Sequence, residues 1–140
     1  MAEFTFRELV KRAGREADYW VQSAATTSEE LGNPLYPPAR KTLIAHGIPV
    51  TPREVRKITR DDYRKYDRII GMDEENMLDL YALFRDDPER KIHRLMEYSD
   101  RRGDVADPWY TRDFEAAWRD IRDGCRGLFR DLEGVPAPDC

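Results

Sequence analysis

The chain has 140 residues and a mass of 16.5 kDa, which is the size of one ordinary domain. Forty per cent of its residues are apolar and 37% are charged, a balance that excludes a disordered chain. The longest apolar runs are four or five residues, far below the roughly 18 that a membrane span needs. No basic-then-apolar leader opens the sequence, which predicts a cytoplasmic protein. A net charge of −4 argues against a dedicated nucleic-acid binder.

The first third of the chain predicts a helix, a strand and a second helix. Apolar residues on one face indicate a helix up to about residue 13, which Gly14 ends. Residues 19–25 begin with aromatic and β-branched side chains, a pattern typical of a strand that runs into a loop. Pro38 suits the first turn of a helix over residues 39–46, which Gly47 closes.

The middle third predicts two further strands with a helix between them. Thr59 and Asp62 have the spacing of a capping pair and predict a short helix. Residues 68–72 indicate a buried strand, and residues 91–98 an edge strand with polar interruptions. Asp73 caps a helix from 74 to about 84, whose inward side chains we expect to be Met77, Leu80, Tyr81 and Phe84.

The last helix gives the clearest periodicity in the chain. Thr111 is its expected cap and Gly134 its end. Its apolar residues recur at intervals of four and three: Phe114, Trp118, Ile121, Cys125, Leu128 and Leu132. Strands that alternate with helices imply an α/β fold with a parallel sheet covered on both faces. The chain opens on a helix with no strand ahead of it, a first hint that a further segment precedes Met1.

Several short motifs occur in a specific order along the chain. They are Ser23-Ala24-Ala25-Thr26, Gly32-Asn33-Pro34, Pro37-Pro38-Ala39-Arg40, Ala45-His46-Gly47-Ile48, Met72-Asp73-Glu74-Glu75-Asn76 and Asp107-Pro108-Trp109-Tyr110. In this order and spacing the chain resembles the low-molecular-weight protein-tyrosine phosphatases from Met1 to about Leu132. The resemblance implies a three-layer α/β/α fold around a four-stranded parallel sheet, with a domain over residues 1–134 and a tail at 135–140. It also implies phosphomonoester hydrolysis through a phosphocysteine intermediate.

One defining feature of that family is missing from these residues. Members of that family begin with a central strand that runs into a Cys-x5-Arg loop, which supplies the nucleophile and grips the phosphate. Neither the strand nor the loop is found here, so we expect the chain as written to be inactive and its fold to be marginal or partner-dependent. Cys125 and Arg130 do not replace the loop, because their spacing is one residue short and they lie within a helix. We expect Cys125 to pack in the core and Cys140 to be a free thiol.

The resemblance also assigns roles to individual residues, each with a plainer alternative. Asp107 matches the general acid, although Asp-Pro is also ordinary turn chemistry before a helix. Trp109 and Tyr110 match a pair that walls the substrate cleft, or else they pack at the base of the last helix. Glu30 falls in a loop that flanks the entrance. His46 matches a residue that supports the phosphate loop, or else it caps a helix C-terminus.

The expected ligands follow from the same comparison. Two histidines and scattered aspartates give no metal-ligand spacing, and no cofactor is expected. The expected partner is a phosphotyrosine protein or a small aryl phosphate, provided that the missing loop is supplied; nucleic acid and membrane are not expected partners. The leading hypothesis is a phosphatase whose start is absent. One alternative is a pseudophosphatase that binds phosphoproteins or other partners; a lower-ranked one is an arsenate reductase on the same fold.

Overall fold

Helices and strands alternate as the sequence predicts only in the second half of the described chain, and the first half is helical. The computed structural model describes residues 1–28, 32, 35–52, 54–101, 103–106, 108 and 112–140. Its elements are α1 (Ala2–Arg12), η1 (Glu16–Asp18), α2 (Pro37–Ala45), α3 (Arg60–Lys65), β1 (Ile69–Gly71), α4 (Glu74–Leu83), β2 (Ile92–Arg94), η2 (Leu95–Tyr98) and α6 (Phe114–Glu133). In the described part of the chain, no helix combines the length and apolar character that crossing a membrane needs.

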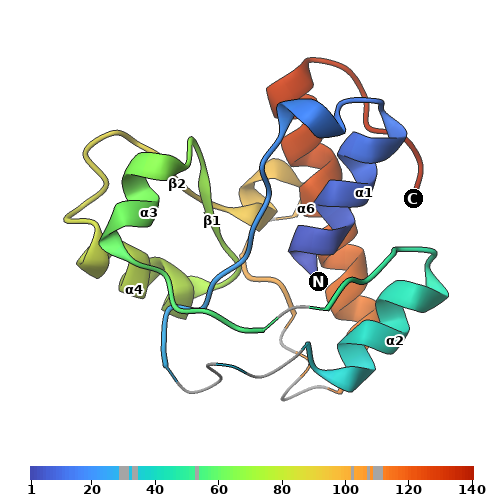
Figure 1. Ribbon diagram of the computed structural model, residues 1–140, viewed down its shortest axis with the longest axis horizontal. Helices are drawn as coiled ribbons and strands as arrows, with labels where there is room; N and C mark the ends of the chain where they lie inside the picture. Colours follow the sequence, from blue (N-terminus) through green and yellow to red (C-terminus); the bar gives the residue numbers. More distant parts are fainter. Residues whose placement is uncertain (29–31, 33–34, 53, 102, 107, 109–111) are drawn as a thin grey trace.

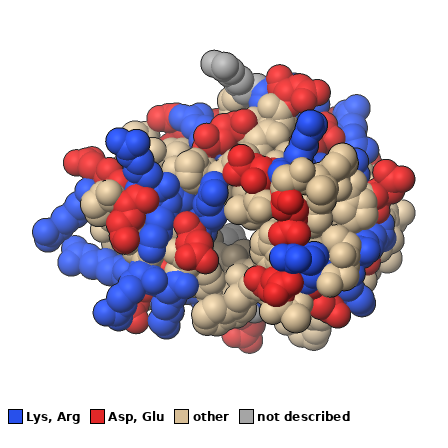
Figure 2. Space-filling view, turned by 90° about the horizontal axis from the view of Figure 1, so that it is seen from above, with Lys and Arg blue, Asp and Glu red and all other residues tan. Residues whose placement is uncertain are grey.

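These elements form two halves that lie side by side. Figure 1 shows α3, α4, β1 and β2 in one half and α1, α2 and α6 in the other. Seen from above, Lys and Arg crowd the half that contains the strands, the other half mixes both signs of charge, and a hollow lies between them (Figure 2). The half with the strands has a core around Ile69 and Leu80, and the other half has two, one around Leu9 and one around Leu43.

The half that contains the strands is built on a two-stranded parallel sheet. Ile69 of β1 is in register with Ile92 of β2, and α4 covers the pair. Asp73 caps α4 as predicted, because its Oδ1 accepts from the Asn76 N–H at 2.8 Å. Tyr81 was expected to face inward, but it is 38% exposed. It lies at the edge of the buried stripe that faces the sheet, about 100° around the helix from Leu80; the stripe consists of Met77, Leu80 and Phe84.

The third predicted strand is shorter than expected. After Arg94 the chain leaves β2 and winds into η2, where Leu95 and Met96 are buried against α6. Glu97 stabilises this change of direction, since its Oε1 accepts from the backbone N–H of Arg94 at 2.8 Å. The prediction of a strand over residues 91–98 is therefore correct only at its start.

The other half is organised around α6, whose predicted periodicity is confirmed. Trp118, Ile121, Cys125 and Leu128 are all buried against α1, α2 and η2. The predicted stop at the end of the helix is confirmed too, since Gly134 is left-handed with φ 73°. The structure corrects the predicted N-cap of this helix. The cap is Asp113, which accepts from the Ala116 N–H at 2.9 Å, and Thr111 lies outside the described residues.

Residues 19–24 do not form the predicted strand. The described chain forms one isolated parallel bridge next to them, between Ala25 and Lys57. A strand needs a neighbour that donates and accepts backbone hydrogen bonds, and here the Val21 carbonyl accepts instead from the side chain of Arg7 at 2.6 and 3.0 Å. The parallel sheet of an α/β fold is confirmed with two paired strands; the other strands and the three-layer arrangement stay a prediction.

Gly127 allows α6 and η2 to approach closely enough to touch backbone to backbone. A Cβ at this position would lie 1.7 Å from the Tyr98 carbonyl oxygen. At an exposed position in a helix, Gly→Ala stabilises the protein by about 1 kcal/mol. Here the obstacle is backbone, so we expect Gly127→Ala to lower the free energy of unfolding by about 2 kcal/mol, as other overpacked sites do.

Urea denaturation of the purified variants measures this difference. Arg119→Ala on the exposed face of the same helix is the control, and it should change stability by less than about 0.5 kcal/mol. A Gly127→Ala variant as stable as the parent would show that the contact between α6 and η2 is not tight.

Candidate active site

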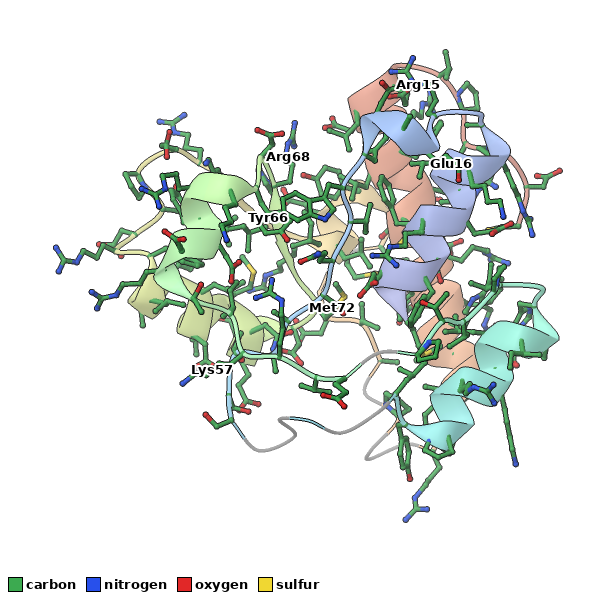
Figure 3. All side chains as sticks on the ribbon, in the orientation of Figure 1. Arg15, Glu16, Lys57, Tyr66, Arg68 and Met72 are labelled. Atoms are coloured by element: carbon green, nitrogen blue, oxygen red, sulfur yellow. The ribbon has the colours of Figure 1, made fainter. Side chains whose placement is uncertain are left out.

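The carboxyl end of β1 is where the two halves meet. The backbone N–H of Met72, just after the strand, donates to Asn76 Oδ1 at 3.1 Å. The Met72 carbonyl accepts from the Val105 N–H at 2.9 Å, so the segment before α6 crosses this end of the strand. Figure 3 shows Met72 near the middle of the molecule. Ligands of open α/β sheets bind beyond the carboxyl ends of the strands, which makes this region the candidate active site.

A pocket of about 300 Å³ opens at the amino end of α1. The positive end of the helix dipole favours an anion there, whereas the carboxylates of Glu3 and Glu54 oppose one. The pocket therefore needs further positive or amide groups before it can hold a phosphate. Its lining comes from the first turn of α1, two loops and the segment before α3: Met1, Glu3, Phe4, Ser23, Ala24, Ala25, Leu35, Glu54, Val55 and Arg56.

Glu3 is a buried carboxylate that joins α1 to the extended segment beside it. Its side chain is 2% exposed and pairs with Arg7 at 3.0 Å, one turn along the helix. The Ser23 hydroxyl donates to Glu3 Oε1 at 2.6 Å, and Arg7 also donates to the Val21 carbonyl. A buried charge is costly unless it is paired, so these bonds hold the first turn of α1 against residues 21–23. They fix two walls of the pocket relative to each other.

Arg56 lines the pocket, but its charge is paired with the carboxylate of Asp62. Its guanidinium donates to both carboxylate oxygens of Asp62, at 3.0 and 3.3 Å. The Asp62 carboxylate also accepts from the Thr59 backbone N–H at 2.7 Å, which confirms the predicted capping pair of α3. The hydrogen bonds to Asp62 raise the pKa of Arg56. The arginine thus stays charged, yet its charge is balanced by Asp62.

Met1 lies where the pocket meets the core. It lines the pocket and packs against two of the core clusters, one around Leu9 and one around Leu43.

Neither cysteine is an activated thiol, because burial raises the pKa of both. Cys125 is 1% exposed on α6, and burial raises its pKa to about 12. A thiol with that pKa stays protonated at neutral pH and is not a nucleophile. This confirms the prediction that Cys125 packs in the core. Cys140 is a free thiol of intermediate exposure, and burial raises its pKa as well.

His46 is the C-cap of α2, and its side chain contacts α6. Its ring stacks on the indole of Trp118 with a centroid distance of 3.6 Å, and its Nε2 lies 2.7 Å from Glu115 Oε2. His46 also occupies the C-cap of α2, in keeping with the plainer of its two predicted roles. Support of a phosphate loop by His46 stays a prediction.

Four of the predicted site residues lie outside the described residues. They are Asp107, Trp109, Tyr110 and Glu30. Their predicted roles as proton donor, cleft wall and entrance residue stay predictions. The residue before Asp107 is described: the backbone N–H of Ala106 donates to Asp120 Oδ2 at 3.0 Å.

Sequence reasoning missed the network of Glu3, Arg7 and Ser23. A glutamate in the first turn of a helix, four residues before an arginine, is an ordinary surface pair in most helices. The one signal that separates this pair from a surface pair is that Glu3 lies between the apolar residues Ala2 and Phe4. Among the described residues, no group of three or more His, Cys, Asp or Glu side chains forms a metal-binding arrangement.

Comparison with known sequences gives one consistent match. The family described as low molecular weight phosphotyrosine protein phosphatase matches residues 1–135. Low molecular weight protein-tyrosine-phosphatase YfkJ of Bacillus subtilis is 31% identical over 135 residues, which cover 95% of this chain and 86% of that protein. The Homo sapiens low molecular weight phosphotyrosine protein phosphatase is 33% identical over 133 residues, which cover 91% and 84%.

Solved structures lead to the same group of proteins. The crystal structure of YfkJ from Bacillus subtilis aligns with a TM-score of 0.90 at 30% identity, over 95% of this chain and 85% of that one. The crystal structure of SP-PTP, a low molecular weight protein tyrosine phosphatase from Streptococcus pyogenes, aligns with a TM-score of 0.82 at 32% identity, over 94% and 82%. The α/β architecture with its parallel sheet is thus shared with both.

The pairing of Asp62 makes stability depend on pH. Burial acts to raise the pKa of Asp62, but the hydrogen bonds from Arg56 and Thr59 outweigh it and lower the pKa. The stabilisation is therefore fully present above the unfolded pKa of about 3.9 and is lost as pH falls through the lower folded pKa. We expect Asp62→Asn to cost about 1–2 kcal/mol at pH 7 and progressively less below pH 4.

Urea unfolding at pH 7 and pH 3 tests this expectation. Asp61→Asn is a matched neighbour, because the Asp61 side chain is 54% exposed and its pairs with Arg64 and Lys65 are worth little. A cost of Asp62→Asn that is the same at both pH values would contradict the assigned pairing.

The different burial of the two thiols predicts different reactivity. Iodoacetamide at pH 8 should modify Cys140 in the folded protein, whereas Cys125 should react only after unfolding in urea. Intact mass spectrometry counts the adducts. Two adducts on the folded chain would show that Cys125 is accessible and more acidic than its burial implies.

Proposed function

This chain belongs to the low molecular weight phosphotyrosine protein phosphatase family, and we propose that it is the body of a phosphatase that hydrolyses phosphotyrosine and small aryl phosphate esters. In this proposal the nucleophile comes from a Cys-x5-Arg segment joined ahead of Met1. The observation that carries it is the pocket at the amino end of α1, which is walled by Ser23 and Ala25 and lies where such a segment would end.

The cysteines of the chain support the placement of the nucleophile outside these residues. The sequence has two cysteines, and Asp131 stands where an arginine would complete Cys-x5-Arg after Cys125. Burial holds the Cys125 thiol in its protonated form. Neither arginine near the pocket can replace the arginine of Cys-x5-Arg, because Arg7 pairs with Glu3 and Arg56 with Asp62.

The hollow between the halves supports a further strand in the sheet. Among the described residues, no backbone–backbone hydrogen bond joins residues 19–24 to another segment. Val21, Ile70 and Met72 pack against the helical core but are only partly buried. Figure 2 shows a hollow between the two halves. A strand inserted there would satisfy the backbone groups of the extended segment and cover these apolar side chains.

The proposed chemistry follows the family resemblance. The thiolate of the added cysteine attacks phosphorus, the S–P bond forms, and the P–O bond to the aryl group breaks. Asp107 donates its proton to the departing aryl oxygen. Asp107 then takes a proton from the water that attacks phosphorus, which releases inorganic phosphate and the free thiolate.

A second candidate function is a pseudophosphatase that binds phosphoproteins or other partners. The observation in its favour is that these 140 residues contain no activated thiol. The carboxylates of Glu3 and Glu54 in the pocket count against phosphate binding by this chain alone.

The decisive experiment compares the 140-residue chain with one that carries an added segment ahead of Met1. The segment is a strand and Cys-x5-Arg, about 15 residues in all. The substrates are p-nitrophenyl phosphate and a phosphotyrosine peptide. We expect hydrolysis by the extended chain and none by the 140-residue chain, with a loss of about 100-fold for Asp107→Asn in the extended chain.

Replacing the added cysteine with serine is the matched control and should abolish turnover. An extended chain that folds, as judged by circular dichroism, but hydrolyses neither substrate would refute the proposal and favour the pseudophosphatase. Turnover by the 140-residue chain alone would refute the placement of the nucleophile.

A further inference from the structure

The segment before Asp107 is held on both sides by hydrogen bonds that its backbone N–H groups donate. On one side the Val105 N–H donates to the Met72 carbonyl at 2.9 Å, at the carboxyl end of β1. On the other side the Ala106 N–H donates to Asp120 Oδ2 at 3.0 Å, from the second turn of α6. Val105 is buried, so the first bond is shielded from water. Asp107 follows directly in the sequence.

Asp120 is itself held in place by a charged partner. Arg101 donates to Asp120 Oδ1 at 2.8 Å and pairs with Asp123 at 2.9 Å, so one guanidinium bridges two carboxylates of α6. These hydrogen bonds raise the pKa of Arg101. The Asp120 side chain is 20% exposed, which makes it less screened than an ordinary surface carboxylate. One of its oxygens thus faces Arg101 while the other receives the Ala106 N–H.

We propose that Asp120 is a positioning residue for the proton donor Asp107. This inference rests on the proposed function. The Asp120 carboxylate holds the backbone immediately before Asp107. Because Asp120 lies on α6, this backbone is held against a rigid helix. A proton donor must lie within hydrogen-bond reach of the leaving oxygen, and a displacement on the order of 1 Å costs about 100-fold in rate.

The reaction step that should respond to Asp120 is the first one. The phosphoryl group passes from the aryl oxygen to the cysteine sulfur, and the proton of Asp107 goes to that oxygen. A poor leaving group such as phenolate needs this proton, whereas p-nitrophenolate departs readily without it. Misplacement of Asp107 should therefore slow phenyl phosphate more than p-nitrophenyl phosphate.

The first experiment uses the 140-residue chain and does not depend on activity. Amide hydrogen exchange at Ala106 is measured in Asp120→Ala, Asp120→Asn and Asp123→Ala. Asp120→Ala removes the acceptor, and we expect exchange to speed up about tenfold. Asp120→Asn keeps an acceptor oxygen and should restore most of the protection. Asp123→Ala is the matched control, because it removes the second partner of Arg101 but leaves the bond to Ala106.

The second experiment measures kcat/KM in the extended chain, because this quantity reports transfer of the phosphoryl group. We expect Asp120→Ala to lower the ratio of phenyl phosphate to p-nitrophenyl phosphate turnover by about tenfold, within the range that general acids contribute. Asp123→Ala should leave the ratio unchanged, and Asp120→Asn should restore most of it. A general loss of folded protein lowers both substrates equally and does not move the ratio.

The possible failures are distinguishable. An inactive extended wild-type chain refutes the proposed function, whatever the variants do. An active chain whose substrate ratio is unchanged in Asp120→Ala refutes the role of Asp120 alone. Unchanged exchange at Ala106 in Asp120→Ala refutes the anchoring that this role requires.

Discussion

The arrangement of the candidate site depends on one buried carboxylate. Glu3 sits in the first turn of α1 and is removed from water, which is tolerable only because Arg7 and Ser23 satisfy it. The same arginine reaches the Val21 carbonyl, so helix and extended segment are held as one unit. Since α1 packs on α6, the walls of the pocket take their position from the helical core.

The two arginines near the pocket are paired within the protein and are not directed at a ligand. Arg7 faces Glu3 and Arg56 faces Asp62. An anion at the amino end of α1 thus depends on the helix dipole and on backbone amides. The described arginines beside the pocket therefore add little positive charge for an anion to bind.

The sequence predicted those parts of the fold that depend on neighbours along the chain. The α6 stripe, the Asp73 cap and the Thr59–Asp62 pair are local patterns, and the structure confirms them. Residues 19–24 carry the side chains of a strand, but pairing depends on a neighbouring segment that local sequence does not reveal. The Glu3–Ser23 contact was missed for the same reason, since twenty residues separate its partners. For Asp107, Trp109, Tyr110 and Glu30, family resemblance was the only guide to their roles.

The close contact at Gly127 fixes how the sheet sits against the helices. There the backbone of α6 touches the Tyr98 carbonyl, and η2 continues directly from β2. Leu95 and Met96 of η2 are buried beside this contact. The strand-bearing half is thereby fastened to the helical half along the β2 border, so the sheet takes its position from α6.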